Sequence, residues 1–168
     1  MIDVYEYYKN VLGNFYTDTV NVNIFKKLYS YSLKDTLIVK VNYNYYKDVA
    51  TSIVFGKLKL DINIEFIDIY SLLNLYLRNE DDYLDTLEYL KKCDYLIVYE
   101  MGRISNKAIN EYISDILMIR KMNGLGTLVL IDLYDFNNLV RNIDGIYLLK
   151  LDGFLSGEVK GSKLKDIF

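Results

Sequence analysis

A lysine and a set of carboxylates are the residues of this sequence whose types and spacing suit chemistry. Lys47 follows the apolar run TLIVKV, and carboxylates end later apolar runs at Asp68, Glu100 and Asp132. The chain has no histidine and a single cysteine, Cys93. Histidine-based catalysis, histidine metal sites, cysteine zinc sites and internal disulfides are therefore excluded. Carboxylates, lysines, hydroxyl groups and the backbone are left to do chemistry.

The window VNYNYYKD, residues 41–48, has the outline of a phosphate-binding loop between a strand and a helix. Such a loop, GxxxxGK[ST], uses glycines so that backbone N–H groups can wrap phosphate, a lysine for charge and a hydroxyl for magnesium. Here Val41 and Tyr46 occupy the glycine positions, Lys47 keeps the lysine, and Asp48 replaces the hydroxyl. Lys47 and Asp48 are therefore predicted to be a vestigial phosphate loop. An ordinary strand-to-helix loop with a solvated lysine is the alternative that this window alone favours.

A magnesium cluster is a second hypothesis, from a different class of function. Asp68, Glu100, Asp132 and Asp135 all lie at or just beyond predicted strand ends, and Lys150 ends another strand. Hard oxygen ligands suit Mg²⁺, and such clusters support phosphoryl transfer. Carboxylates also commonly end strands and cap helices, so a purely structural role stands against this hypothesis.

Apolar periodicity predicts helices and strands in alternation along the chain. The predicted strands cover residues 36–41, 63–69, 94–100, 127–133 and 145–151. The predicted helices cover residues 2–12, 22–33, 49–60, 70–77, 79–93, 105–124 and 134–142. Strands that are apolar almost throughout, alternating with helices, indicate a three-layer α/β/α domain with a five-stranded, mostly parallel sheet.

The whole chain, 1–168, is predicted to be a single α/β domain. Residues 1–35 form amino-terminal helices, 36–151 the core, and 152–168 a carboxyl-terminal hairpin or tail. In such parallel sheets ligands bind beyond the carboxyl ends of the strands, where the lysine and the carboxylates fall.

Composition limits the partners and the location. The net charge of −3 does not indicate nucleic acid as the main ligand. No apolar run approaches the roughly 20 residues that span a bilayer, and no signal peptide is recognised, so a cytoplasmic location without membrane contact is expected. The chain has no proline and 18 tyrosines, which indicates an AT-rich genome.

The run CDYLIVYEMG resembles the Walker B strand of the DnaC/DnaI/IstB group of AAA+ ATPases, where LLILDDLG is the usual form. A helix, YLDTLEYLKK, leads straight into it, as in that family. Further on, AINEYISDILMIRKMNGLGTLVLIDLYDFNNLV resembles the family's long helix and sensor-1 strand, and IEFIDIYSLLNLY its second strand and helix. The resemblance covers about residues 37–140 and implies a P-loop NTPase fold of the AAA+ helicase-loader type.

The resemblance also implies which functional residues have changed. Tyr99 stands where the first Walker B acid organises magnesium, and Glu100 matches the second, which orients the attacking water. The sensor-1 position falls near Leu133, with Asp132 just before it. If the protein were an active ATPase, Glu100 and Asp132 would be its catalytic residues.

Two further family features are the arginine finger and the carboxyl-terminal lid. Arg103 and Arg141 are the arginines near the expected edges, and neither can be assigned as an arginine finger. The family's carboxyl-terminal lid is expected to be truncated, since 28 residues follow Val140.

With both Walker motifs eroded, the resemblance implies a non-catalytic ATPase-like module without a cofactor. It would bind a replication or mobile-element protein, such as a replicative helicase or another AAA+ subunit. Nucleotide binding without hydrolysis, with ATP held by Lys47 and backbone amides, stays open as an alternative. The magnesium-dependent enzyme described above stays open too.

The tyrosines of the loop suggest what replaces the phosphate. Tyr43, Tyr45 and Tyr46 are predicted to form a partner surface, because tyrosine is enriched in interface hot spots. Alternatively these side chains fill the vacated loop, or stack on nucleobases as aromatic platforms do.

Overall fold

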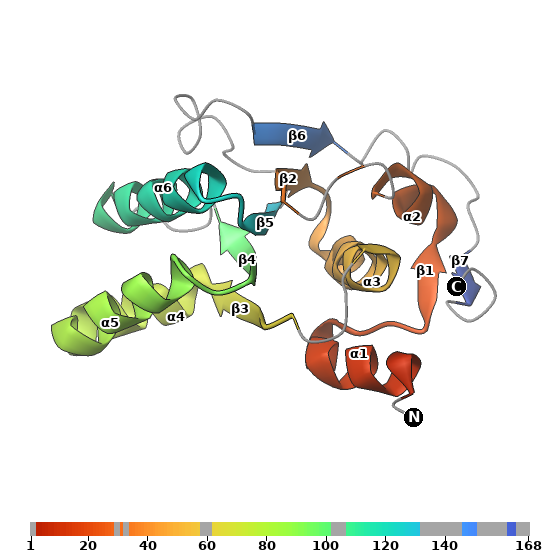
Figure 1. Ribbon diagram of the computed structural model, residues 1–168, viewed down its shortest axis with the longest axis horizontal. Coiled ribbons are helices and arrows are strands. Elements are labelled where there is room, and N and C mark those ends of the chain that lie inside the picture. Colours follow the sequence, from red (N-terminus) through yellow and green to blue (C-terminus); the bar gives the residue numbers. More distant parts are fainter. Residues whose placement is uncertain are drawn as a thin grey trace.

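The computed structural model describes residues 3–28, 31, 34–57, 62–101, 107–131, 146–150 and 161–163 (Figure 1). The described helices are α1 (Val4–Leu12), α2 (Val22–Leu28), α3 (Tyr46–Lys57), α4 (Ile69–Arg78), α5 (Glu80–Leu90) and α6 (Lys107–Met122), with short 3-10 helices η1 (Gly13–Phe15) and η2 (Tyr43–Tyr45). The described strands are β1 (Thr19–Asn21), β2 (Thr36–Lys40), β3 (Ile64–Asp68), β4 (Tyr95–Met101), β5 (Gly126–Ile131), β6 (Ile146–Lys150) and β7 (Gly161–Lys163).

The main sheet has five strands in the order β3-β4-β5-β2-β6, and every neighbouring pair is parallel. The expected five-stranded α/β sheet is therefore confirmed. The register is regular in the middle, where Thr36 of β2 lies opposite Thr127 of β5 on one side and Ile146 of β6 on the other. Residues of β5 are buried along its whole length, as expected for a strand covered on both faces.

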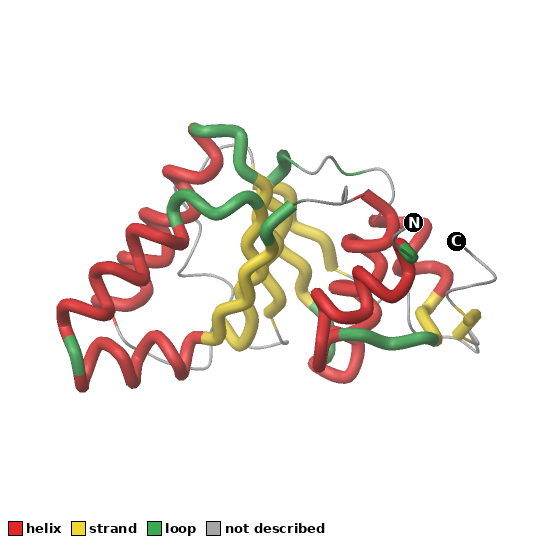
Figure 2. Tube along the Cα trace, turned by 60° about the horizontal axis from the view of Figure 1, so that its bottom comes forward, coloured by secondary structure: helices red, strands yellow, loops and turns green. Residues whose placement is uncertain are grey.

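Helices cover both faces of the sheet and complete the three layers (Figure 2). Alternate residues of each central strand belong to different cores: Leu37 and Val39 of β2 pack with α1, α2 and α3, whereas Ile38 packs with α4, α5 and α6. The same alternation holds in β5, where Leu128 faces the first core and Val129 the second. The period of two follows from the pleat of a strand.

The order of the strands gives β2 a particular position. The chain leaves β2 through α3 on one face and reaches the sheet edge at β3, and the later helices α4, α5 and α6 return it to β5 along the other face. The direction of winding thus reverses between β2 and β5. In open α/β sheets this reversal marks the usual ligand site, beyond the carboxyl ends of the strands.

Local signals explain several helix ends. The side chain of Asn79 accepts a hydrogen bond from the N–H of Asp82 at 3.1 Å and caps α5, whose first turn is acidic as the helix dipole favours. Gly124, with φ of 67°, closes α6, and the following N–H of Leu125 donates to the carbonyl of Arg120 at 2.9 Å. The helix predicted over residues 105–124 therefore ends within two residues of its expected end.

The amino-terminal segment forms more than the two predicted helices. β1, which sequence periodicity did not reveal, pairs antiparallel with β7, so that Thr19 lies opposite Lys163 and Asn21 opposite Gly161. Of the hairpin or tail predicted over residues 152–168, residues 161–163 are described and form β7, and the others lie outside the described residues. β7 joins the amino-terminal segment in a separate two-stranded sheet.

A buried arginine ties the elements together at the amino-terminal end of the sheet. Arg120 is fully buried, and its Nε donates to the Thr127 hydroxyl at 2.8 Å. Its Nη1 donates to the carbonyls of Leu90 at 2.8 Å and Cys93 at 2.6 Å, and its Nη2 to that of Gly126 at 2.8 Å. Burial lowers the Arg120 pKa from its ordinary value. The guanidinium joins the last turn of α6 to the end of α5 and the start of β5.

None of the helices in the described part of the chain is long and apolar enough to cross a membrane.

Candidate functional site

The loop after β2 begins as a continuation of the sheet. Val41 is fully buried, and its N–H donates to the carbonyl of Ile131 in β5 at 2.9 Å. In a phosphate loop this position is a glycine that starts a wide turn. Here the Val41 side chain packs in the core with α3, so the residue at the first motif position still continues the sheet.

The next backbone amides are satisfied within the loop. The side chain of Asn42 accepts from the N–H of Asn44 at 3.0 Å, and the Asn42 carbonyl accepts from the N–H of Tyr45 at 2.9 Å. The N–H of Tyr46 donates to the carbonyl of Tyr43. A phosphate would need these same donors. The loop is thus a tight 3-10 turn that runs directly into α3, rather than a cradle of free N–H groups.

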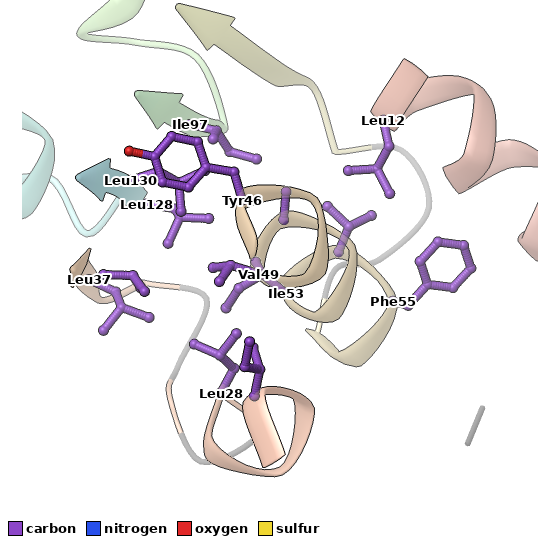
Figure 3. Close-up of a cluster of buried hydrophobic side chains, with 14 of the residues drawn as sticks. Leu12, Leu28, Leu37, Tyr46, Val49, Ile53, Phe55, Ile97, Leu128 and Leu130 are labelled. Carbon is purple, nitrogen blue, oxygen red and sulfur yellow. The ribbon is translucent and has the colours of Figure 1, made fainter. Parts of the chain in front are cut away.

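The three tyrosines of the loop lie in different environments. Tyr43 is 55% exposed, Tyr45 is half-buried, and Tyr46 is 6% exposed. Tyr46 packs into the core of the α1–α3 face, where Figure 3 shows it beside Leu128 and Leu130 of β5. The assignment of Tyr46 to a partner surface is therefore corrected: as the first residue of α3 it points onto the sheet.

Lys47 and Asp48 are adjacent in α3 but differ in how far their side chains are exposed. Lys47 is exposed. Asp48 is half-buried, and its Oδ2 accepts from the N–H of Asn21, at the end of β1, at 2.7 Å. Burial raises the Asp48 pKa, and hydrogen bonds from the backbone N–H groups of Asn21 and of Asp48 itself oppose the rise. The residue at the magnesium-hydroxyl position thus holds the amino-terminal segment against α3.

A neighbouring threonine of α3 makes a second contact of this kind. The Thr51 hydroxyl donates to the carbonyl of Phe15 at 3.0 Å and accepts from the N–H of Thr17 at 3.1 Å. Sequence reasoning did not find these contacts, because 34 to 36 residues separate the partners and no local pattern marks them.

Asp68, proposed as a magnesium ligand, caps α4. Its Oδ1 accepts from the Ser71 N–H at 2.7 Å, and its Oδ2 accepts from the Ser71 hydroxyl at 2.6 Å. The hydroxyl of Tyr99 also donates to Asp68 Oδ2, at 3.2 Å. The structure therefore brings together Asp68 and the tyrosine at the first Walker B position, a pairing that sequence reasoning did not predict.

Tyr99 is held from both sides. Its ring meets Phe15 edge to face, with centroids 4.7 Å apart, and Phe15 in turn stacks on Phe66 of β3 with centroids 4.9 Å apart. Aromatic side chains from η1, β3 and β4 thus lie together near the carboxyl end of the sheet, and the Tyr99 hydroxyl reaches Asp68 from there.

Glu100 lies at an irregularity of β4. The register between β4 and β5 shifts between Tyr99 and Met101, so Glu100 is the additional residue of a bulge. Bulges are common beside functional sites because they redirect a side chain. The side chain of Glu100 lies outside the described part of the chain, as do Asp132, Asp135, Arg103 and Arg141. Lys150 ends β6, opposite Lys40 of β2.

The described residues do not gather a metal site. Among them, no group of three or more carboxylates and cysteines lies close enough together to hold a metal ion. Because Glu100 and Asp132 are not among the described side chains, the proposed Mg²⁺ cluster stays a prediction.

Comparisons with known proteins show which solved structures share this fold. No protein-family model and no curated protein matches the sequence. The structure is similar to the replication initiator DnaA bound to AMPPCP and single-stranded DNA, with a TM-score of 0.56, 11% identity and 76% of this chain covered. It is also similar to domain III of Thermotoga maritima DnaA, with a TM-score of 0.53, 13% identity and 77% covered.

The DnaC helicase loader is a third similar structure, with a TM-score of 0.52, 16% identity and 77% of this chain covered. The chain spans 44% of the first DnaA chain and 58% of the Thermotoga maritima domain, but 86% of the DnaC chain. At these identities the likeness shows the fold. The expectation from the sequence is confirmed at that level: this chain shares the fold of the solved DnaA and DnaC structures.

Proposed function

We propose that the chain is a non-catalytic module of the AAA+ fold that docks a protein of DNA replication or of a mobile element. The observation that carries this proposal is the loop after β2. Its amides at residues 44–46 are bonded within the loop, and Tyr46 occupies the core. A triphosphate bound there would have to displace these contacts.

The positions that would organise magnesium support the same conclusion. Asp48 stands where a hydroxyl would bind the metal, and it is engaged with Asn21. Tyr99 stands where a carboxylate would, and its hydroxyl donates to Asp68. In P-loop enzymes, metal and lysine together neutralise the charge that develops during phosphoryl transfer. Lys47 alone supplies only one of these elements.

The test is nucleotide binding and turnover by the full chain. We expect no magnesium-dependent release of phosphate from ATP, and no binding of a fluorescent ATP analogue that Lys47→Ala weakens. Lys26→Ala, at an exposed lysine of α2, is the matched control. Turnover that is lost in both Lys47→Ala and Glu100→Gln would overturn the proposal. Binding without turnover, lost in Lys47→Ala alone, would replace it with a nucleotide-binding function.

The magnesium-dependent alternative gives a different result. A phosphatase or nuclease activity that is lost in Asp132→Asn but intact in Lys47→Ala would assign the site to the strand-end carboxylates. Asp68→Asn distinguishes a metal-ligand role of Asp68 from a helix-capping role, because Asp68 already accepts hydrogen bonds from Ser71 and Tyr99. Loss of α4 stability without loss of activity would mark it as a cap.

A protein rather than duplex DNA is the partner that the surface favours. Tyr43 exposes 55% of its surface next to the loop, and the net charge of the chain is −3. Duplex binding relies on many phosphate contacts from basic side chains. The similar structures include a helicase loader and an initiator bound to single-stranded DNA. We therefore propose a replicative helicase or another AAA+ subunit as the partner.

The docking test uses the purified replicative helicase of the same host, with single-stranded and duplex DNA as competing probes. We expect helicase binding that Tyr43→Ser weakens and Tyr70→Ser leaves unchanged, since Tyr70 is an exposed tyrosine of α4. Tyr46 is left intact because it is buried. Tight, salt-sensitive DNA binding without helicase binding would contradict the proposal and support a nucleic-acid function.

A further inference from the structure

The strand β3 is an edge of the main sheet and is only partly covered. Among the described strands it pairs with β4 alone, and all five of its residues are half-exposed, whereas every residue of β5 is buried. In Figure 1, α4 and α1 lie on either side of β3, and no strand lies beyond it. Edge strands present unpaired backbone groups, which is why proteins usually protect them.

The outward backbone groups of β3 can be assigned from its pairing with β4. The N–H of Tyr95 donates to the carbonyl of Asn63 at 3.1 Å, so the odd-numbered residues of β3 turn their backbone groups toward β4. Ile64 and Phe66 therefore turn their N–H and C=O groups outward. Within the part of the chain that the structure describes, nothing pairs with them.

The charged side chains of β3 do not guard this edge. Glu65 accepts a hydrogen bond from the Tyr89 hydroxyl of α5 at 2.6 Å, and Asp68 caps α4. The strand contains no lysine or proline, the residues that most often block edges. The edge is short but open and apolar at Ile64, Phe66 and Ile67.

A hollow lies on each face of β3. The first, of about 360 Å³, lies between α1 and the start of the strand and is lined by Tyr7, Val11, Ile62, Asn63 and Ile64. The second, of about 470 Å³, lies between the end of the strand and the α4–α5 pair and is lined by Ile67, Ser71, Asn74, Leu75, Arg78 and Thr86. Ile64 packs on the α1–α3 core and Ile67 on the α4–α6 core, so the hollows are on opposite faces.

The spacing of the two hollows matches an added strand. Ile64 and Ile67 are three residues apart, about 10 Å along the strand. In an extended segment laid beside β3, two side chains three residues apart also point to opposite faces. We propose that the free edge of β3 binds one extended segment of a partner protein by strand addition. One neutral hydrogen-bonding side chain of the segment enters the first hollow, and an apolar side chain three residues away enters the second.

Charge and lining select these side chains. The surface of the first hollow is more polar than apolar and none of its lining residues is charged, which suits a neutral hydrogen-bonding side chain. The surface of the second hollow is mostly apolar, with the cation Arg78 among its lining residues, which suits an apolar side chain. A basic side chain would meet Arg78. An acidic one would enter a region, residues 62–94, that holds eight carboxylates and three basic residues, a net charge of −5 within a chain of net charge −3.

The walls of the edge favour a single segment over a second copy of this chain. α1 lines one hollow and α4 and α5 the other, so helices flank the edge on both faces. Two copies joined at β3 would bring these helices against each other, whereas one extended chain fits between them. The proposal does not depend on the loop after β2, which belongs to a strand separated from β3 by β4 and β5.

The first test needs no partner. Hydrogen exchange of the free full chain should be faster at the amides of Ile64 and Phe66 than at those of Glu65 and Ile67, which face β4. Equal protection at every dilution would show that the chain covers its own edge. Protection that grows with protein concentration would show that a second copy covers it. Either result would overturn the proposal.

The second test identifies the segment. A displayed library of random peptides about nine residues long is selected on the full chain. We expect selected peptides to share an apolar and a neutral polar residue three positions apart. Val11→Arg, which fills the first hollow, should weaken them by about tenfold or more, and Lys26→Ala, the control on α2, by less than about twofold.

N-methylated peptides keep this test independent of how the variants fold. Strand addition uses the N–H groups along one side of the peptide only. Methylation of one alternate set of amides should therefore abolish binding, and methylation of the other set should leave it unchanged. Failure to select any peptide, equal loss with both methylated sets, or peptides that are indifferent to Val11→Arg would overturn the proposal.

Discussion

The two ends of the main sheet handle their polar groups in opposite ways. At the amino-terminal end, one long side chain, Arg120, donates to acceptors from α5, from β5 and from the turn before β4 in a buried network. At the carboxyl-terminal end, several short interactions each serve a local purpose. There Asn42 turns the loop after β2, Asp48 holds Asn21, and Asp68 caps α4.

The difference is the one expected if the chain is the non-catalytic module that we propose. Ligands of α/β sheets bind at the carboxyl end, so a buried network at the opposite end is structural. At the carboxyl end, two carboxylates that could have bound a ligand accept hydrogen bonds from the protein's own backbone instead. Asp48 and Asp68 both accept from backbone N–H groups in this way. The comparison therefore sets a buried structural network against a loop and two carboxylates whose hydrogen bonds are made within the protein.

The largest effect that would test this comparison is removal of the guanidinium. Arg120→Ala leaves four buried acceptors without their donor, and each buried unsatisfied group costs about 1–3 kcal/mol. We expect the free energy of unfolding to fall by more than about 4 kcal/mol. Urea denaturation followed by circular dichroism measures it. Lys121→Ala, at the next residue of α6, is the control, and a loss below about 1 kcal/mol in Arg120→Ala would contradict the structural role.

The next effect concerns the carboxyl end and uses two tyrosines of one loop. Tyr46→Ala removes a buried ring and should cost about 3 kcal/mol, as aromatic truncation in a core does. Tyr43→Ala removes an exposed ring and should change the free energy of unfolding by less than about 0.5 kcal/mol. Thermal and urea denaturation compare the two variants. Equal losses would mean that the loop is not divided into a filled and an exposed part.

Sequence reasoning succeeded where the cause is local. The strands β2, β4 and β5 are short, continuous apolar runs, and the pleat and the layers follow from that pattern. The helix predicted over residues 105–124 ends close to Gly124, because a residue that tolerates positive φ is needed there. The resemblance to helicase loaders added the fold, which the structural likeness confirms.

Sequence reasoning failed where the interacting residues are distant in sequence. Asp48 meets Asn21 across 27 residues, and β1 exists because β7 returns to pair with it. Arg120 reads in the sequence as a basic residue in the last turn of a helix, which usually means a solvated one. Tyr46 follows two other tyrosines in a polar loop, and only the start of α3 on the sheet shows that it is buried.

A smaller effect compares two threonines that face each other across β2 and β5. Thr36 and Thr127 are register partners and both are fully buried. Thr127 accepts from Arg120, whereas no partner among the described residues reaches the Thr36 hydroxyl. Thr127→Val should therefore cost about 1.5–3 kcal/mol, and Thr36→Val should be neutral or stabilise by about 1 kcal/mol. Urea midpoints with unchanged slopes measure both, and a larger loss in Thr36→Val would reveal a partner for its hydroxyl.

The smallest effect is a dependence of stability on pH at Asp48. Burial raises the pKa of this carboxyl in the folded protein, so the folded state holds the proton more tightly than the unfolded state does. The stability that the group contributes is fully present below its unfolded pKa, about 4, and is lost as the pH rises through the folded value.

Asp48→Asn tests the sign of this dependence. The amide oxygen of asparagine can still accept from the Asn21 N–H but does not ionise. The free energy of unfolding of the wild type minus that of the variant should therefore fall as the pH rises from about 3 to about 6. Asp85→Asn, at an exposed residue of α5, controls for removal of a carboxylate. A difference that grows with pH would mean that the folded protein stabilises the ionised form of Asp48. A carboxylate beside a cation at a phosphate site would behave in that way, and the contrast between the two ends of the sheet would then be lost.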